Sequence, residues 1–255
     1  MSTVDTQELD DKVRQIYRQV AEHPRSAFHF EMGRPLAERL GYPSELLDAV
    51  PSGAVESFAG VGYFFDLAAL RPGERVLDLG SGSGADAFAA AHLVGHSGWV
   101  VGVDFTREQL EKARRLAATA GLDQLVEFWE RRIEVLPMAD AAFDCVISNG
   151  VINLSADKGK VFAEAARVLR HGGRLAIADI VTEQQLTDAI VANADLWASC
   201  IGGAAQQDTY RALIESAGLV VRVVRSNDYT FISDQARGAS ARYGVKSISL
   251  LATKP

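Results

Sequence analysis

The sequence predicts an α/β fold whose doubly wound, mostly parallel sheet has seven strands. First, short apolar runs alternate with helix-like segments from Arg75 onward, as in parallel strands whose sheet is covered by helices on both faces. Second, the first of these runs ends in a glycine-rich turn, LGSGSG. Third, the apolar runs over 220–230 and 245–255 look like two consecutive strands. We therefore expect five parallel strands followed by an antiparallel pair, with the last strand antiparallel.

The individual elements follow from periodicity and from start and stop signals. Apolar residues recur at helical spacing within 9–50, which predicts an N-terminal helical cap, and a glycine-containing loop follows over 51–64. Thr106 and Gln109 fit a capping box, and Asp157 fits an N-cap. Strands are expected over 75–80, 99–104, 126–132, 143–149 and 173–181, and helices over 85–95, 107–121, 157–173, 182–203 (irregular) and 210–219.

This order suggests a division of the chain into four parts. Residues 1–70 would form the helical cap and its loop, and 71–181 the core that binds a cofactor. A helical insertion over 182–219 would lie on the acceptor side, and 220–255 would complete the core sheet.

Composition excludes several classes of function. The net charge is −7 and no basic stripe interleaved with aromatic residues occurs, so a nucleic acid is not expected as a partner. Cys145 and Cys200 have no metal-site or disulfide spacing, so no metal is expected. The N-terminus is polar and acidic, and no apolar run approaches the length of a membrane span. We expect a cytoplasmic protein without membrane contact that acts on a small molecule, alone or as an oligomer.

The glycine turn is the most informative motif. Gly80, Gly82 and Gly84 between a strand and a helix would let a cofactor approach the backbone near the helix N-terminus. A tight turn without ligand is the plain alternative, and the turn also satisfies the dinucleotide fingerprint. Asp78 argues against a dinucleotide, because a carboxylate would repel a pyrophosphate. It suits a ligand with an ammonium group, such as S-adenosylmethionine.

LDLGSGSG, VGVD and RHGGRLAIAD together resemble the motifs of class I S-adenosylmethionine-dependent methyltransferases, which have a Rossmann-like fold. The resemblance implies S-adenosyl-L-methionine as cofactor, S-adenosyl-L-homocysteine as product, and an acidic side chain on the ribose hydroxyls. Relatives often place an acid that accepts the adenine amino group where this chain has Arg132, which has no acceptor atom. The implied cofactor-binding residues are Asp78, Gly80, Ser81, Gly82, Gly84, Asp104 (ribose), Phe105 and Ile133 (adenine faces), Glu134 and Asn149.

A more specific resemblance is to the arsenite methyltransferase branch. It rests on ISN-x-VINLS-x-DK, LGYPSELLDAVPSGA and CIGGA, and extends over most of the chain. That branch binds trivalent arsenic through cysteine thiolates. Val61 and Gly150 stand at two of its cysteine positions, and only Cys200 remains. A small, partly apolar organic acceptor, methylated on O, N, S or C, is therefore favoured over an arsenite or other metalloid acceptor.

Acceptor and catalytic residues are predicted from the aromatic stretches around the sheet edge. A general base is needed only if the acceptor must lose a proton, and His29 and Tyr17 are the catalytic candidates. Each has a plain alternative, in surface placement or helix packing. The expected acceptor contacts are Tyr63, Phe64, Asn153, Trp197 and Cys200. Two further functions stay open: a nucleotide-binding or dinucleotide oxidoreductase module, and a partner subunit that has lost its chemistry.

Overall fold

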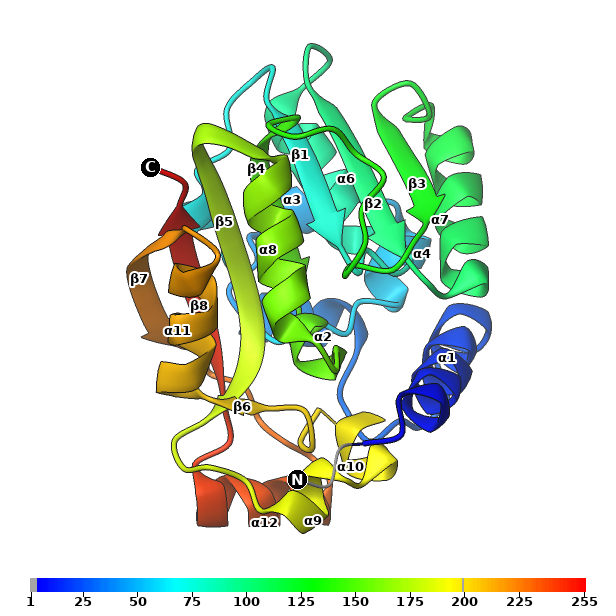
Figure 1. Cartoon of the computed structure of the whole chain (residues 1–255). Coiled ribbons are helices and arrows are strands. Elements are labelled where there is room, and N and C mark those ends of the chain that lie inside the picture. The colour runs from blue at the N-terminus through cyan, green and yellow to red at the C-terminus, as the bar shows by residue number, and fades with distance from the viewer. Residues whose placement is uncertain (1–3, 199) are drawn as a thin grey trace.

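A single mixed sheet forms the centre of the protein (Figure 1), whose computed structural model describes residues 4–198 and 200–255. Its seven main strands follow the order β3-β2-β1-β4-β5-β8-β7, and β8 runs antiparallel to both neighbours. The predicted fold class is therefore confirmed. A two-residue strand that the sequence did not suggest, β6, pairs with the end of β5. The bounds are β1 Arg75–Leu79, β2 Trp99–Asp104, β3 Val126–Glu130, β4 Phe143–Asn149, β5 Leu169–Thr182, β6 Ala205–Gln206, β7 Val220–Ser226 and β8 Lys246–Thr253.

Helices cover both faces of this sheet. Alternate strand residues point to opposite faces, so that Val76 and Val100 pack with helices α2 to α7, whereas Leu77 and Val101 pack with α8 and α11. In Figure 1, α8 and α11 lie in front of the sheet and α3 and α6 behind it. The bounds are α1 Thr6–Glu22, α2 Gly33–Arg39, α3 Ser44–Asp48, α4 Ser52–Glu56, α5 Phe65–Ala68, α6 Ala85–Val94, α7 Arg107–Ala120, η1 Ile152–Leu154, α8 Lys158–Val168, α9 Asp188–Val191, α10 Ala194–Ala198, α11 Gln207–Ser216 and α12 Asp234–Tyr243.

The bounds of β3, β5, α8 and α11 differ by a few residues from the sequence prediction, and one helix was not predicted. Helix α8 ends at Val168 and not at the glycines near residue 172, because Leu169 already has extended backbone and its side chain is fully buried. The segment between the last two strands contains helix α12, capped by Ser233, whose hydroxyl accepts a hydrogen bond from Ala236 N. The apolar residues of α12 show too weak a helical periodicity for this helix to be predicted from the sequence.

The carboxyl ends of the parallel strands meet at one edge of the sheet, and α1 lies beside this edge (Figure 1). Asp5 begins α1 by accepting hydrogen bonds from the backbone N–H groups of residues 7 and 8. Leu9 and Val13 of α1 then pack in a small cluster with Leu154 and Trp197. The helical cap is thus held against the edge where ligands of open α/β sheets bind. No described helix has the length and apolar character of a membrane span.

Candidate cofactor and acceptor site

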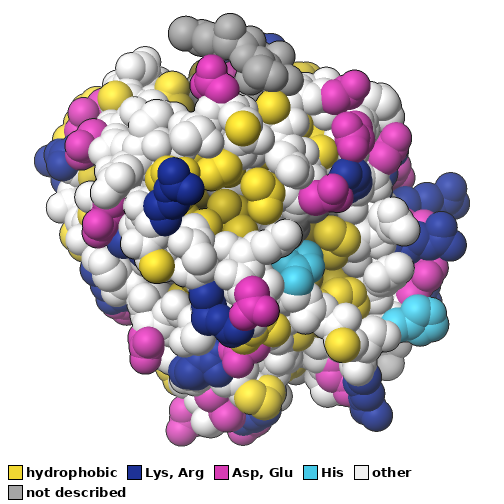
Figure 2. Space-filling view, turned by 90° about the horizontal axis from the view of Figure 1, so that it is seen from below, with side chains coloured by type: hydrophobic (Ala, Val, Ile, Leu, Met, Phe, Trp, Pro, Cys, Tyr) yellow, Lys and Arg dark blue, Asp and Glu magenta, His cyan; other side chains and the backbone are white. Residues whose placement is uncertain are grey.

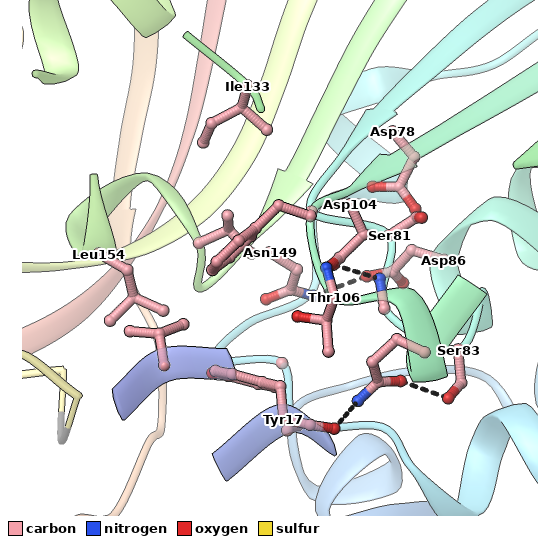
Figure 3. Close-up of a pocket in the computed structure, with 18 of the residues that line it drawn as sticks. Tyr17, Asp78, Ser81, Ser83, Asp86, Asp104, Thr106, Ile133, Asn149 and Leu154 are labelled. Carbon is pink, nitrogen blue, oxygen red and sulfur yellow. Dashed lines mark hydrogen bonds between the residues drawn. The ribbon is translucent and has the colours of Figure 1, made fainter. Parts of the chain in front are cut away.

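A pocket lies at the carboxyl ends of β1, β2 and β4, between the sheet edge and α1 (Figure 3). Its walls combine carboxylates and serines near the glycine turn with apolar side chains on the opposite side. The lining residues are Asp10, Val13, Tyr17, Ala54, Ser57, Phe58, Ala59, Gly60, Asp78, Gly80, Ser81, Gly82, Ser83, Ala85, Asp86, Asp104, Phe105, Thr106, Gln109, Arg132, Ile133, Glu134, Asn149, Val151, Leu154 and Ser155.

The glycine turn brings backbone to the pocket where a side chain would not fit. Gly80 has a φ of 73°, and a Cβ atom there would lie 2.3 Å from Val151 Cγ2. Gly84 begins α6 with a φ of 93°, and its Cβ would meet the rings of Phe88 and Phe128 at 2.8 Å. Glycine is therefore required at both positions, but Gly84, unlike Gly80 and Gly82, does not line the pocket as predicted, and its close contacts are with core rings.

Asp104 fixes the turn from the end of β2. Its carboxylate accepts hydrogen bonds from Gly82 N at 3.0 Å and from Thr106 N at 2.7 Å. Burial raises the pKa of Asp104, and the hydrogen bonds that it accepts oppose that rise. Asp104, the residue predicted to bind the ribose hydroxyls, therefore lines the pocket, and its carboxylate also holds the glycine turn in place.

The predicted capping box at α7 is wrong in its side-chain contacts. Thr106 stands at the N-cap position, but its side chain makes no capping hydrogen bond. Gln109 is engaged elsewhere, since its side chain accepts from Ser83 Oγ and donates to Tyr17 O at 2.8 Å (Figure 3). This amide therefore links α7 to the glycine turn and to α1.

Asp78 and Ser81 carry polar atoms that fit a ligand in this pocket. Asp78 is buried, and no described residue pairs with its Oδ2. Ser81 Oγ is likewise buried without a described partner. Burial, followed by the charges of Asp86 and Asp104, raises the pKa of Asp78 well above its ordinary value. The ammonium group at the amino-acid end of S-adenosylmethionine could donate hydrogen bonds to these two oxygens, which lack donors within the described residues.

Asp86, Tyr42 and Asn149 form a buried network that sequence reasoning missed. Tyr42 Oη donates to Asp86 Oδ1 at 2.6 Å, and Asn149 Nδ2 lies 3.0 Å from both Tyr42 Oη and Asp86 Oδ2. The same amide donates to Gly62 O, and its oxygen accepts from Val61 N at 2.7 Å. Asn149 lines the pocket as predicted, but its polar atoms hold the loop over 60–62. The available signal was a single acidic residue in the first turn of the mostly apolar helix ADAFAAAHLV.

We expect Tyr42→Phe to lower the free energy of unfolding by about 1–2 kcal/mol, because Asp86 loses a buried donor. Burial already raises the pKa of Asp86 to about 6, and this pKa should rise further in the variant. Thermal and denaturant unfolding at pH 7 measure the effect. Tyr63→Phe is the matched control, because its ring packs 5.0 Å from that of Tyr42 but its hydroxyl lies outside the network. Equal losses in both variants would contradict the assignment.

The far end of the pocket has an aromatic and an aliphatic wall. Phe105 lies with the guanidinium carbons of Arg14 and Arg132 at 5.2 Å and 5.9 Å from its ring centroid. Ile133 is largely buried and lines the same space. Glu134 accepts a hydrogen bond from Ser155 Oγ at 2.6 Å. The three predicted adenine-side residues therefore meet in one part of the pocket.

None of the five predicted acceptor residues lines the pocket, and of the two catalytic candidates only Tyr17 does. Tyr17 lines the pocket, and burial raises its pKa well above the ordinary value. Asn153 and Trp197 are buried beside it in other contacts: Asn153 donates to Asp179 Oδ1 and Gly150 O, and Trp197 Nε1 to Val191 O. The pocket walls do not include His29, Tyr63, Phe64, Asn153, Trp197 or Cys200.

His29, Phe64 and Tyr63 have packing positions in the structure. The His29 ring meets Phe30 edge-on at 4.6 Å, and Phe30 in turn stacks on Tyr17 at 6.2 Å. Phe64 is fully buried in the core, and Tyr63 packs against it with part of its ring exposed. Hydrophobic packing therefore accounts for the positions of these three side chains.

Val61 and Gly150, which stand where the arsenite methyltransferase branch has cysteines, pack against each other and leave no space between them. Val61 is 2% exposed, and a Cβ at Gly150 would lie 3.2 Å from Val61 Cγ1. Cys200 remains, and burial raises its pKa to about 12, so its thiol is protonated near neutral pH. Among the described residues, no group of three His, Cys, Asp or Glu side chains could hold a metal ion.

Comparison with known proteins identifies the chain as a methyltransferase-family member. The family model described as "Methyltransferase domain" matches residues 70–218. An arsenite methyltransferase from Halobacterium salinarum is 40% identical over 86% of this chain and 56% of its own. Methyltransferase GfsG of Streptomyces halstedii is 38% identical over 65% of this chain and 58% of its own. The chain spans about half the length of the curated relatives it matches.

Two solved structures have the same architecture. An arsenic(III) S-adenosylmethionine methyltransferase from Chlamydomonas reinhardtii superposes with a TM-score of 0.64 at 30% identity, over 88% of this chain and 74% of that one. A geranyl diphosphate C-methyltransferase from Streptomyces coelicolor, solved with S-adenosyl-L-homocysteine, gives a TM-score of 0.70 over 99% and 100%. Its identity of 16% supports the fold alone.

Proposed function

This chain belongs to the methyltransferase-domain family, and we propose on that premise that it is an S-adenosylmethionine-dependent enzyme that methylates a small, partly apolar organic acceptor. The acceptor atom would be O, N, S or C. When bound, the cofactor supplies an electrophilic methyl group. The chain must then align the acceptor atom with that group and exclude water.

The cofactor would be held by the residues already grouped in the pocket. Asp78 would pair with the ammonium group, and the backbone over 80–82 would hold the amino-acid end. Asp104 would accept hydrogen bonds from the ribose hydroxyls, because a carboxylate can accept several at once. Phe105 and Ile133 would bracket the adenine ring.

The contact between Val61 and Gly150 carries the choice of an organic acceptor. Arsenic chemistry needs several soft thiolates around one centre, and these two positions hold a buried isopropyl group and no side chain. The lone Cys200 thiol, protonated near neutral pH, would be a poor ligand for a soft metalloid.

The surroundings of the pocket support an acceptor with apolar surface. Phe58, Val151 and Leu154 contribute apolar walls beside Tyr17. Figure 2 shows hydrophobic side chains gathered near the middle of the face that carries α9, α10 and α12. Tyr17 would stay protonated and would donate a hydrogen bond to the acceptor, because its raised pKa makes it unsuited to act as a base. His29 would then serve packing and not catalysis.

The test is a screen with labelled S-adenosylmethionine. We expect label to enter organic nucleophiles with apolar bodies, and not arsenite supplied with excess glutathione. Arsenite methylation above the level of a protein-free blank would contradict the proposal. It would favour the second candidate, a thiol-dependent metalloid methyltransferase, which the 40% identity to an arsenite methyltransferase brings forward.

Cys200→Ser should leave methylation of an organic acceptor unchanged within about twofold, because a neutral, partly buried thiol packs like a small hydrophobe. Alkylation of the wild-type thiol by iodoacetamide at pH 8 should be slow, since the Cys200 pKa of about 12 leaves little thiolate. Cys145→Ser within β4 is the matched control, because that buried thiol has a pKa similarly raised to about 12. Loss of organic methylation in Cys200→Ser alone would contradict this expectation, and arsenite methylation that is lost in Cys200→Ser alone would support the metalloid candidate.

A further inference from the structure

Arg132 at the far end of the pocket is paired with an acid from a distant helix. Its Nη1 donates to Asp10 Oδ2, and its Nη2 lies 3.3 Å from Asp10 Oδ1. Asp10 belongs to α1, whereas Arg132 follows β3, so the contact joins the helical cap to the core. Both residues line the pocket beside Phe105 and Ile133.

A purine with an exocyclic amino group needs a hydrogen-bond acceptor at this end. Arg132 offers only donors. Glu134 also keeps acceptor capacity, but contacts to Ser155 Oγ at 2.6 Å and Arg132 Nε at 3.5 Å hold its side chain, which keeps only 14% of its surface exposed. The two Asp10 oxygens can accept about four hydrogen bonds together, so acceptor capacity remains after the Arg132 contacts. The Asp10 side chain keeps 22% of its surface exposed.

We propose that Asp10 accepts the hydrogen bond from the adenine amino group of the cofactor and that Arg132 positions its carboxylate. The bidentate guanidinium contact fixes the orientation of the carboxylate and compensates its charge at the edge of the slot formed by Phe105 and Ile133. The acid that recognises adenine is thereby supplied by α1, and an arginine occupies the position next to the slot.

A consequence is that cofactor affinity depends on the docking of α1. The backbone carbonyl of Tyr17, about two turns further along α1, accepts from Gln109, and Gln109 also contacts Ser83 in the glycine turn. Asp10 at one end of the pocket and Tyr17 at the other would close together over a bound cofactor. This inference rests on the cofactor and not on the proposed acceptor, so either can fail alone.

Calorimetry tests the contact without any methyl transfer. The ligands are S-adenosylhomocysteine and its analogue whose purine carries hydrogen in place of the amino group. Wild-type protein should prefer S-adenosylhomocysteine by about tenfold or more, the contribution of a hydrogen bond to a charged group. In Asp10→Ala the ratio should fall to about one, and in Asp10→Asn, which keeps a neutral acceptor, to a few-fold.

Matched variants distinguish loss of the contact between Asp10 and adenine from a general loosening of α1 on the core. Asp11→Ala removes the neighbouring exposed carboxylate of α1 and should keep the wild-type ratio. Glu134→Gln should also keep it. An unchanged ratio in Asp10→Ala, or a ratio that collapses only in Glu134→Gln, overturns the proposal. If Asp10→Ala binds neither ligand measurably, Asp10→Asn decides: a reduced ratio supports the contact and the wild-type ratio overturns it.

Discussion

Gly80→Ala is expected to weaken S-adenosylhomocysteine binding by about a hundredfold or more, equivalent to about 3 kcal/mol. The new Cβ would lie 2.3–2.7 Å from three atoms of Val151, and these distances are far below van der Waals contact. Val151 is β-branched and lies between β4 and η1 as the N-cap of η1, so it cannot move without displacing the turn that leads to η1. The turn that approaches the cofactor would therefore shift. Calorimetric titration and ligand-induced thermal stabilisation measure the loss.

Gly121→Ala supplies the control for backbone strain. Gly121 ends α7 with a φ of 68°, similar to the 73° of Gly80, but nothing lies within 4 Å of its would-be Cβ. Both variants carry the cost of about 1–2 kcal/mol for a left-handed alanine. Only Gly80→Ala adds the clash beside the pocket. Equal cofactor affinities in the two variants would show that the turn tolerates a side chain.

The sequence correctly predicted those parts of the site whose position depends only on residues adjacent in the chain. Three glycines between a strand and a helix determine a close backbone approach locally, and Asp104 follows from its place at the end of β2. Alternation of apolar runs likewise gave the sheet, because parallel strands buried on both faces leave a strong local pattern. Phe105 and Ile133 lie in the pocket for the same reason, directly after a strand or its following loop.

Long-range pairing accounts for what sequence did not reveal. Tyr42 and Asp86 are separated by 44 residues, and Asn149 and Asp86 by 63, so no local pattern links them. Asn149 was expected to face a ligand, and its polar atoms instead secure the loop before β1. Arg132 was visible only as a misfit, because its partner Asp10 lies 122 residues away. The division of the chain into four parts, and the cytoplasmic location, remain predictions.

Asp78→Asn should stabilise the ligand-free protein and weaken cofactor binding. A buried carboxylate with an unpartnered oxygen costs about 1–3 kcal/mol, and a neutral amide removes the charge. The free energy of unfolding at pH 7.5 should rise by about that amount. The amide cannot form an ion pair with an ammonium group, so S-adenosylhomocysteine affinity should fall by about tenfold to a hundredfold. Asp123→Asn, at an exposed loop, is the control and should change neither quantity.

The pH dependence of stability distinguishes this explanation from a simple packing effect. Burial raises the folded-state pKa of Asp78 above its ordinary 3.8, so its favourable contribution is complete below about pH 4 and is lost as pH rises through the folded pKa. Asp86 behaves alike, with loss between 3.8 and about 6. Ligand-free wild-type protein should thus lose stability on this account as pH rises, and Asp78→Asn should lose less. Cofactor affinity in the wild type should change oppositely, because the ammonium group favours the ionised carboxylate. If Asp78→Asn is less stable than the wild type at every pH measured, or binds S-adenosylhomocysteine equally well, then Asp78 is paired within the protein and does not bind the ammonium group.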